Sequence, residues 1–287
     1  MRVASETGRV REVVDAVAAD LRAAGCATPR VDAELLVGHV LGLTRSELLL
    51  AREQELDERE RARVEELAAR RARREPLAYV LGEWGFRRLT LAVDRRVLVP
   101  RPETEIVVER CLALLAGREA PRVLDVGTGS GAIALAIADE HPGARVTGLD
   151  VSTDALRVAE ENARRAGLRL ELLEHDLFRG LPRGPWDLIV ANPPYVEPEE
   201  LEGLEPEVRD WEPRVALVAS GATEAIARAA RGALAPGGAL VLECADGAAS
   251  RVAETLRGLG YVDVAVTPDL VGRERVVEGR APGERGG

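Results

Sequence analysis

From residue 121 onward the sequence alternates between short apolar runs and longer amphipathic ones, and this alternation constrains the fold more than any other feature. Runs such as "RVLDV" and "WDLIVA" have the length of buried strands, whereas "TDALRVAEENARRAG" has the spacing of a helix. Because parallel strands need long crossover connections, which are usually helices, the pattern predicts an α/β fold with a doubly wound parallel sheet. Two final segments, "YVDVAVTP" and "RERVVEGR", are expected to form an antiparallel edge.

A glycine-rich turn follows the first predicted strand. In "VLDVGTGSGAIALA", residues 123–136, Gly127 and Gly129 would let the backbone approach a ligand closely, and Gly131 would let the next helix pack tightly. That helix would also present free N–H groups at its N-terminus. Asp150 ends the second predicted strand, where a carboxylate can bind the two hydroxyls of a ribose. The turn and the acid together predict a cofactor that contains adenosine, without distinguishing nicotinamide from adenosylmethionine.

The third predicted strand is followed by Asp176 and Leu177, which stand where the amino group and the ring face of an adenine would lie. Asp176 could equally be a helix cap, and the residues leave both interpretations open. The predicted cofactor-binding residues are Gly127, Thr128, Gly129, Ser130, Gly131, Asp150, Asp176, Leu177 and Asn192.

The stretch "ANPPYVEPEE", residues 191–200, ends the fourth predicted strand with two prolines, which cannot donate to a strand ladder. The side-chain oxygen of Asn192 and the backbone carbonyl of Pro193 can each accept a hydrogen bond from an –NH₂ group. Pro194 fixes the direction of that carbonyl, and the ring of Tyr195 can cover a flat substrate. The motif offers no proton relay for nicotinamide chemistry, so it favours methyl transfer to a planar amide or amino group. The alternative is a rigid turn without a catalytic role.

The region before the sheet predicts a separate organisation. Residues 1–75 contain four amphipathic stretches with cap residues at Thr28, Thr44 and Asp57, which predict a small helical bundle. Because this separate region carries no cofactor motif, we expect it to recognise the substrate. Residues 76–100 are β-rich and interrupted by Gly and Pro, as in a hairpin linker. Residues 101–279 form the expected catalytic domain, and 280–287 a flexible tail.

Charge and composition narrow the function further. Residues 52–75 carry eight Arg and eight acids, which favours a solvated helix face over an RNA-binding arm. The three cysteines and three histidines are scattered, so we expect neither a disulfide framework nor a metal site. The start, "MRVASETGRVREVV", lacks the apolar core of a secretory signal, and no apolar run approaches the roughly 18–20 residues of a membrane span. The expected location is the cytoplasm, without membrane contact.

An ordered set of motifs carries a family resemblance: "GEWGF", "VLVPRPETE", "DVGTGSGAIALA", "NPPYV", "VRDWEPRVALVA" and "GRERVV". With the helical N-terminal region, this set resembles the release factor glutamine methyltransferases (PrmC/HemK family) among the class I adenosylmethionine-dependent methyltransferases, over nearly the whole chain. The resemblance implies a Rossmann-like sheet and methyl transfer from S-adenosylmethionine. The implied acceptor is the side-chain amide nitrogen of the Gln in the Gly-Gly-Gln motif of class I peptide chain release factors.

The resemblance also bears on individual residues. It agrees with catalytic roles for Asn192, Pro193 and Tyr195, and with a substrate site formed by these residues and Pro194. It leads us to expect an aromatic residue where Leu177 stands. The segment "PRPETE" could be a helix start or a cofactor contact, and Phe86 in "GEWGF" could line the pocket or the core.

The main alternative is a methyltransferase that acts on a base amino group in DNA or RNA. Against it, residues 197–212 carry eight acids and one Arg directly after the predicted pocket. We expect such a segment to repel a phosphate backbone and to attract a basic protein loop, so that release factors and not nucleic acid are the predicted partners. A non-catalytic adenosine-binding protein is a further alternative, which the intact "NPPY" motif disfavours.

Overall fold

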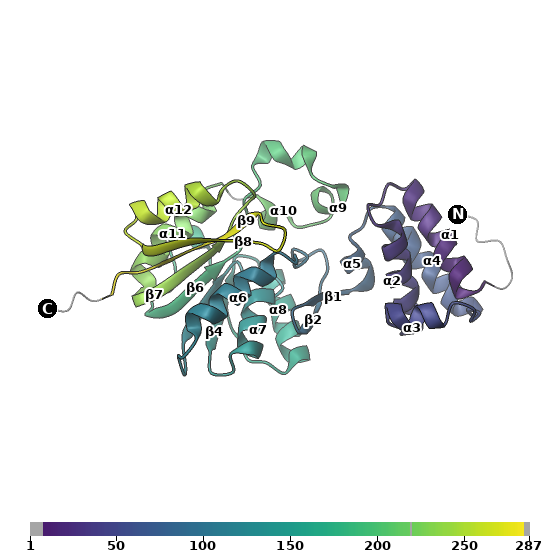
Figure 1. Cartoon of the computed structure of the whole chain (residues 1–287), viewed down its shortest axis with the longest axis horizontal. Helices are drawn as coiled ribbons and strands as arrows, with labels where there is room; N and C mark the ends of the chain where they lie inside the picture. Colours follow the sequence, from purple (N-terminus) through teal and green to yellow (C-terminus); the bar gives the residue numbers. More distant parts are fainter. Residues whose placement is uncertain (1–7, 219, 284–287) are drawn as a thin grey trace. The chain divides into compact units, whose positions relative to one another are not determined.

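The computed structural model describes residues 8–218 and 220–283, and it divides into two compact units (Figure 1). One unit ends at Gly82 and also includes the segment Glu205–Trp211. The other comprises Glu83–Leu204 and the residues from Glu212 onward. The chain therefore passes between the units at three points, and we refer to them as the helical unit and the sheet unit.

The helical unit is built from short helices around an apolar core. Thr44 and Asp57 each accept a hydrogen bond from a backbone N–H three residues later, which confirms them as caps, whereas the Thr28 hydroxyl donates to Asp32. The core gathers valines and leucines from the five helices α1 to α5, among them Val13, Leu36 and Leu67. The helices of this unit are α1 (Val10–Ala23), α2 (Pro29–Leu41), α3 (Arg45–Leu50), α4 (Glu58–Ala72), α5 (Leu77–Leu81) and α9 (Pro206–Arg209).

Helix α5 corrects the expected start of the linker. We expected residues 77–81 to be extended, but they form a helix whose Val80 is buried in the core of the helical unit. Pro76 precedes the helix, and Gly82 ends it in the left-handed conformation, at φ 80°. A five-residue apolar run fits a strand and a helix equally well in sequence, and here its packing against the other helices decides the outcome.

A buried ion-pair cluster joins α9 to the rest of the helical unit. Arg71 is only 5% exposed; its Nε donates to Asp32 Oδ2 at 2.8 Å and its guanidinium also pairs with Glu207 Oε1 at 2.8 Å. Arg74 donates to both carboxylate oxygens of Glu207. The prediction that residues 52–75 present only a solvated charged face is therefore wrong at Arg71, because its carboxylate partners lie far away in the sequence.

The sheet unit contains a seven-stranded sheet in the order β5-β4-β3-β6-β7-β9-β8. The first five of these strands are parallel and the last two are antiparallel, which confirms the predicted doubly wound sheet with its antiparallel edge. The strands are β3 (Arg122–Val126), β4 (Arg145–Asp150), β5 (Glu171–Glu174), β6 (Trp186–Ala191), β7 (Leu234–Glu243), β8 (Val262–Pro268) and β9 (Glu274–Arg280).

Helices cover both faces of this sheet (Figure 1). Neighbouring residues of β6 point to opposite faces, so that Leu188 belongs to the core with α6 and α7, and Ile189 to the core with α11 and α12. The helices of the sheet unit are α6 (Thr104–Leu115), α7 (Ala132–Glu140), α8 (Thr153–Ala166), α10 (Arg214–Leu217), α11 (Ala222–Ala233) and α12 (Ala249–Gly258), with the 3₁₀ helices η1 (Leu177–Arg179) and η2 (Pro198–Gly203).

The ends of the sheet unit differ slightly from expectation. The hairpin of β1 (Glu83–Phe86) and β2 (Leu89–Ala92) is shorter than the predicted linker, and Phe86 is buried in the core and lines no cavity described below. The predicted tail begins at residue 280, yet Arg280 ends β9 and the Ala281 N–H donates to Gly238 O. The rest of that prediction, residues 284–287, lies outside the described residues. No described helix is long and apolar enough to cross a membrane.

Candidate active site

A cavity lies where the central parallel strands end, at the edge of the sheet where α/β proteins bind ligands. Residues that follow four adjacent strands line it together, because parallel strands present their carboxyl ends to the same edge. From the predicted site the lining includes Gly127, Gly129, Asp150, Asp176, Leu177, Asn192 and Pro194. The structure therefore brings together residues up to 67 positions apart that the sequence predicted to share one site.

Asp150 ties the glycine-rich turn to the end of β4. Its Oδ2 accepts the Gly129 N–H at 3.0 Å, and its Oδ1 accepts the Ser152 N–H at 2.9 Å. Burial raises the pKa of Asp150, and these backbone hydrogen bonds oppose the shift. Each carboxylate oxygen retains a further lone pair, which suits the predicted contact with two ribose hydroxyls.

Three residues of the turn do not line the cavity. Thr128 is buried and donates its hydroxyl to Asp125 Oδ2 at 2.7 Å, and the backbone carbonyl of Ser130 accepts a hydrogen bond from Asn162. Gly131 has φ 82°, and a Cβ there would lie 3.1 Å from Leu135 Cδ1. In this structure the three residues shape the turn, and direct contact between them and a cofactor stays a prediction.

Asp176 is a helix cap, as one of the two interpretations had it, and its contact with an adenine stays a prediction. Its carboxylate caps η1 by accepting the Phe178 N–H at 2.9 Å, and the residue also lines the cavity beside Leu177. Phe178 lines the cavity as well, although the prediction missed it. Position 177 itself holds a leucine, and the aromatic side chain that lines the cavity is one position later.

Other lining residues were missed although they lie in or beside segments that carried the resemblance. Arg96, Val97 and Leu98 precede "PRPETE", and Pro213, Val215 and Ala216 belong to "VRDWEPRVALVA". These segments surround the cavity but occur far from the glycine-rich turn in sequence. Both segments belong to the same ordered set of motifs as "NPPY", and this was the signal that could have identified their residues.

Asn192 is connected to the start of α6. Its Nδ2 donates to Thr104 Oγ1 at 3.3 Å, and the Thr104 hydroxyl donates to Glu243 Oε2 at 2.7 Å. Thr104 and Glu243 are both buried. The segment "PRPETE" thus begins a helix, as one interpretation had it, and through Thr104 it also contacts the site.

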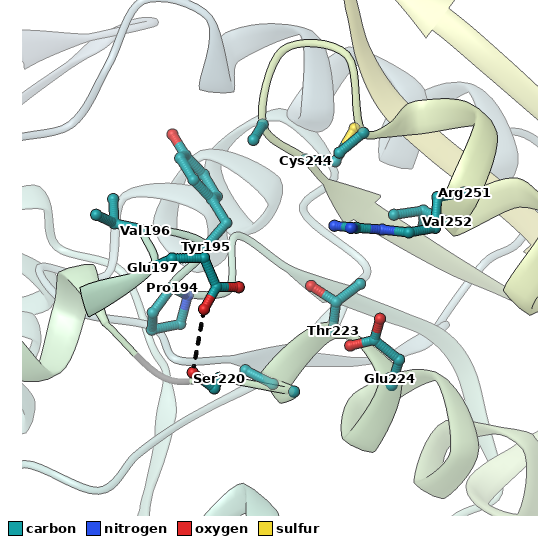
Figure 2. Close-up of a pocket in the computed structure, with 14 residues that line it drawn as sticks. Pro194, Tyr195, Val196, Glu197, Ser220, Thr223, Glu224, Cys244, Arg251 and Val252 are labelled. Atoms are coloured by element: carbon teal, nitrogen blue, oxygen red, sulfur yellow. Dashed lines mark hydrogen bonds between the residues drawn. The ribbon is translucent and has the colours of Figure 1, made fainter. Parts of the chain in front are cut away.

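The remaining residues of "NPPY" differ in the cavities that they line. Pro194 lines the cavity described above and also a second one of about 280 Å³, which Tyr195 lines as well. In Figure 2 the Tyr195 ring points away from Thr223 and Glu224, while Glu197 on the same segment accepts a hydrogen bond from Ser220. Pro193 is buried and Tyr195 is 41% exposed. Neither lines the first cavity, and their contacts with a substrate stay predictions.

The acidic segment after the motif is less uniform than its sequence indicated. Glu205 and Glu207 pair with Arg74 within the helical unit, and Glu212 is buried against Arg101 in the sheet unit. Three of the eight acids are thus compensated by arginines outside the segment, which weakens the expected repulsion of a phosphate backbone. Within residues 8–218 and 220–283 no group of three or more His, Cys, Asp or Glu could hold a metal ion.

The order of the sheet, with its antiparallel β9 and a glycine-rich turn after β3, is that of the class I methyltransferase fold. The chain shares that fold with the 16S rRNA N2 G1207 methyltransferase of Thermus thermophilus, solved in complex with AdoMet and guanosine, at a TM-score of 0.51 and 18% identity over 69% of this chain and 49% of that one. Residues 104–204 match the family model of the methyltransferase small domain.

The particular family follows from the whole chain. Residues 12–82 match the model of the PrmC N-terminal domain. The release factor glutamine methyltransferase of Deinococcus radiodurans is 44% identical over 281 residues, which cover 96% of this chain and 99% of the relative. That of Geobacter sulfurreducens is 40% identical over 96% and 98% of the two chains. The chain belongs to the release factor glutamine methyltransferase family.

Proposed function

We propose that this protein transfers a methyl group from S-adenosylmethionine to the side-chain amide nitrogen of the Gln in the Gly-Gly-Gln motif of class I peptide chain release factors. The names of its full-length relatives support a release factor as the substrate. The fold shared with a methyltransferase solved with AdoMet supports the methyl donor.

One observation carries the proposal: Asn192 lies at the end of β6 in the same cavity as Gly127, Gly129 and Asp150. An adenosine cofactor held by the turn and Asp150 would bring its methyl group toward the residues that accept an –NH₂ group. The sulfonium supplies an activated methyl group, so the acceptor nitrogen forms the new N–C bond as the C–S bond breaks.

A carboxamide nitrogen is a weak nucleophile because its lone pair is delocalised into the carbonyl. In the proposed mechanism Asn192 Oδ1 and the Pro193 carbonyl accept the two N–H groups of the substrate. They orient the nitrogen for in-line attack and stabilise the positive charge that develops on it. The product nitrogen then loses one proton, and the remaining methylamide is neutral. The ring of Tyr195 would close over the planar substrate.

The test is to incubate the protein with S-adenosylmethionine and a purified release factor, and to locate the added methyl group by peptide mass. We expect one methyl group on the Gln of Gly-Gly-Gln. A release factor in which this Gln is replaced by Glu serves as the matched control and should remain unmodified.

Methylation of a nucleic-acid base is the rival outcome. Since part of the acidic segment is compensated by arginines, charge alone is a weaker argument against nucleic acid than the sequence indicated. A parallel reaction with total RNA and with DNA in place of the factor decides between them. Methyl incorporation into either nucleic acid, with none into the factor, would overturn the proposed function.

A further inference from the structure

The carboxamide of Asn192 can perform its proposed role in only one of its two orientations. Its oxygen must face the substrate, because an –NH₂ group there would meet the –NH₂ group of the substrate. In the structure Asn192 Nδ2 donates to Thr104 Oγ1, so the oxygen on the other side of the carboxamide stays available. Hydrogen bonds from neighbouring side chains can fix this orientation of the carboxamide.

We propose that Thr104 and Glu243 are positioning residues that hold the Asn192 carboxamide with its oxygen available to the substrate amide. This inference rests on the proposed function of the site. Strand pairing brings Glu243 beside Asn192, because Ala191 of β6 pairs with Leu242 of β7. Thr104 at the start of α6 joins the two through hydrogen bonds of 3.3 Å to Asn192 and 2.7 Å to Glu243.

The direction of these hydrogen bonds follows from the charge of Glu243. An ionised carboxylate can only accept, so the Thr104 hydroxyl must donate its single hydrogen to Glu243. The hydroxyl oxygen is then left as an acceptor, and only the –NH₂ end of Asn192 can satisfy it. A protonated Glu243 could instead donate to Thr104, whose hydrogen would be free to bond the Asn192 oxygen and to stabilise the reversed orientation.

The surroundings of Glu243 make this change of state accessible near neutral pH. Glu243 is 2% exposed, and burial raises its pKa to about 7 despite the Thr104 hydrogen bond. Arg275 on β9 and Arg101 before α6 favour the ionised form, whereas Glu103 opposes it. Each arginine is shared with another carboxylate, Arg275 with Asp269 at 3.7 Å and Arg101 with Glu212 at 2.6 Å.

Two further titratable groups interact electrostatically with this carboxylate. The hydroxyl of Tyr195 interacts with the charge of Glu243. Burial raises the pKa of the adjacent Cys244 to about 11, so its thiol stays neutral in the range concerned. Glu243 is therefore the group of this cluster whose ionisation changes near pH 7. Methyl transfer should slow as the pH falls below that value.

The test compares single-turnover methyl transfer to the release factor by four variants. Thr104→Val removes the bridging hydroxyl and should lower the rate by up to about 100-fold, the effect of a small misplacement of a reacting group, with unchanged affinity for S-adenosylmethionine. Thr104→Ser keeps the hydroxyl and should retain most of the rate. Glu243→Gln should be slow and lose the acid limb of the pH profile.

Thr147→Val is the matched control. Thr147 on β4 is as buried as Thr104, at 5% exposure each. Its hydroxyl also donates to a glutamate, Glu171 on β5, but this pair has no hydrogen bond to Asn192. This variant should keep the wild-type rate. Equal losses in Thr147→Val and Thr104→Val would attribute the effect to folding and overturn the inference, as would full rates in Thr104→Val and Glu243→Gln.

A second measurement requires no substrate and separates this inference from the proposed function. The side-chain amide signal of Asn192 in the ¹H–¹⁵N spectrum, assigned by its loss in Asn192→Leu, should titrate near pH 7 in the wild type and stay constant in Glu243→Gln. Burial also raises the pKa of Asp125 to about 7 beneath the glycine-rich turn, so a titration common to both proteins would belong to Asp125 and contradict the inference. Absence of methylation with the expected titration would instead reject only the proposed function.

Discussion

Asn192 and Tyr195 are close in sequence but have different surroundings. Asn192 is half-buried, lines the cavity at the carboxyl ends of the central strands and is held by Thr104, whereas Tyr195 is 41% exposed. If the two residues act in the reaction, a substitution at either should lower turnover more than it lowers stability. If the motif is only a rigid turn, turnover should fall only as far as stability does.

We expect Asn192→Leu to slow methyl transfer by roughly 10²–10³-fold, the usual effect of losing a preorganised group that stabilises transition-state charge. Affinity for S-adenosylmethionine should be largely retained. Tyr195→Phe keeps the ring and should be mild, whereas Tyr195→Ala should be severe. Single-turnover rates and melting temperatures of the three variants check this, and rates that simply follow the melting temperatures would show that "NPPY" is only a turn.

Glu243 should also leave a signature in stability. Because folding raises its pKa from 4.5 to about 7, the folded state keeps a proton that the unfolded state releases between these values. Stability therefore decreases as the pH rises through this range. Glu243→Gln removes the cost of the buried charge, so we expect its unfolding free energy to exceed that of the wild type by about 1–3 kcal/mol near pH 8 and to match it near pH 4.5.

Urea denaturation at the two pH values measures the difference. Gln has the size of Glu, and its –NH₂ group can donate to Thr104 as a protonated Glu243 would, so a hydrogen bond between the two residues is kept while the charge is removed. A variant that is less stable than the wild type at the higher pH would show that Arg275 and Arg101 compensate the Glu243 charge fully. Greater stability combined with slower turnover is the pattern expected of a residue retained for its role in the site.

At the residue scale, the sequence predicted those parts of the site whose positions follow from the order of strands along the chain. Asp150, Asp176 and Asn192 stand at the carboxyl ends of β4, β5 and β6 in the parallel part of the sheet, so their proximity follows from its topology. The contact between Thr104 and Asn192 joins residues 88 positions apart through side chains. It depends on where α6 begins against β6 and β7, which no local pattern in the sequence determines.

Among the elements, the turn between β3 and α7 combines two demands on glycine. Gly127 and Gly129 have positive φ, at 75° and 55°, but a Cβ there would meet nothing within 4 Å. Gly131 has positive φ and close neighbours as well, Leu135 Cδ1 at 3.1 Å and Ala159 Cβ at 3.3 Å from an added Cβ. Its role is therefore to seat the N-terminus of α7 against α8.

We expect Gly131→Ala to lower the unfolding free energy by roughly 1–3 kcal/mol, through backbone strain and crowding together. Affinity for S-adenosylmethionine should fall as well, because the N-terminus of α7, which follows the glycine-rich turn, can no longer pack closely against α8. Gly232→Ala in α11 is the control, since a Cβ there meets nothing and alanine favours a helix. Calorimetric binding and denaturation of both variants test the idea, and equal stabilities would contradict it.

Element types were predictable where periodicity extended over several turns or alternated with glycine-rich turns. They were less so at α5, whose five residues were too short for periodicity to distinguish a strand from a helix. The buried state of Arg71 was also beyond local inference, because Asp32 and Glu207, which compensate its charge, come from distant parts of the chain.

At the scale of the whole molecule, we propose that the helical unit recognises the protein substrate and the sheet unit performs the chemistry. All residues that line the cavity with Asp150 and Asn192 belong to the sheet unit. A fragment that begins at Glu83 should therefore bind S-adenosylmethionine with nearly the affinity of the full chain. It should methylate an intact release factor poorly.

A short peptide that contains Gly-Gly-Gln provides the comparison for this prediction. If the helical unit acts in recognition, the fragment and the full chain should methylate the peptide with similar kcat/KM, and only the intact factor should distinguish them. A fragment with full activity on the intact factor would make the helical unit dispensable. Equal losses on both substrates would point to a damaged sheet unit.

The segment Glu205–Trp211 has a consequence for inheritance. It belongs to the helical unit although the chain on either side belongs to the sheet unit, and Glu207 pairs there with the buried Arg71 and with Arg74. Recombination that exchanged only residues 1–82 with a relative lacking these arginines would leave Glu207 unpaired, and a buried charge that loses its partner is strongly destabilising. The helical unit is thus encoded in two separate stretches of the gene, and where two parents differ at these charges a chimaera should fold well only when both stretches come from one parent.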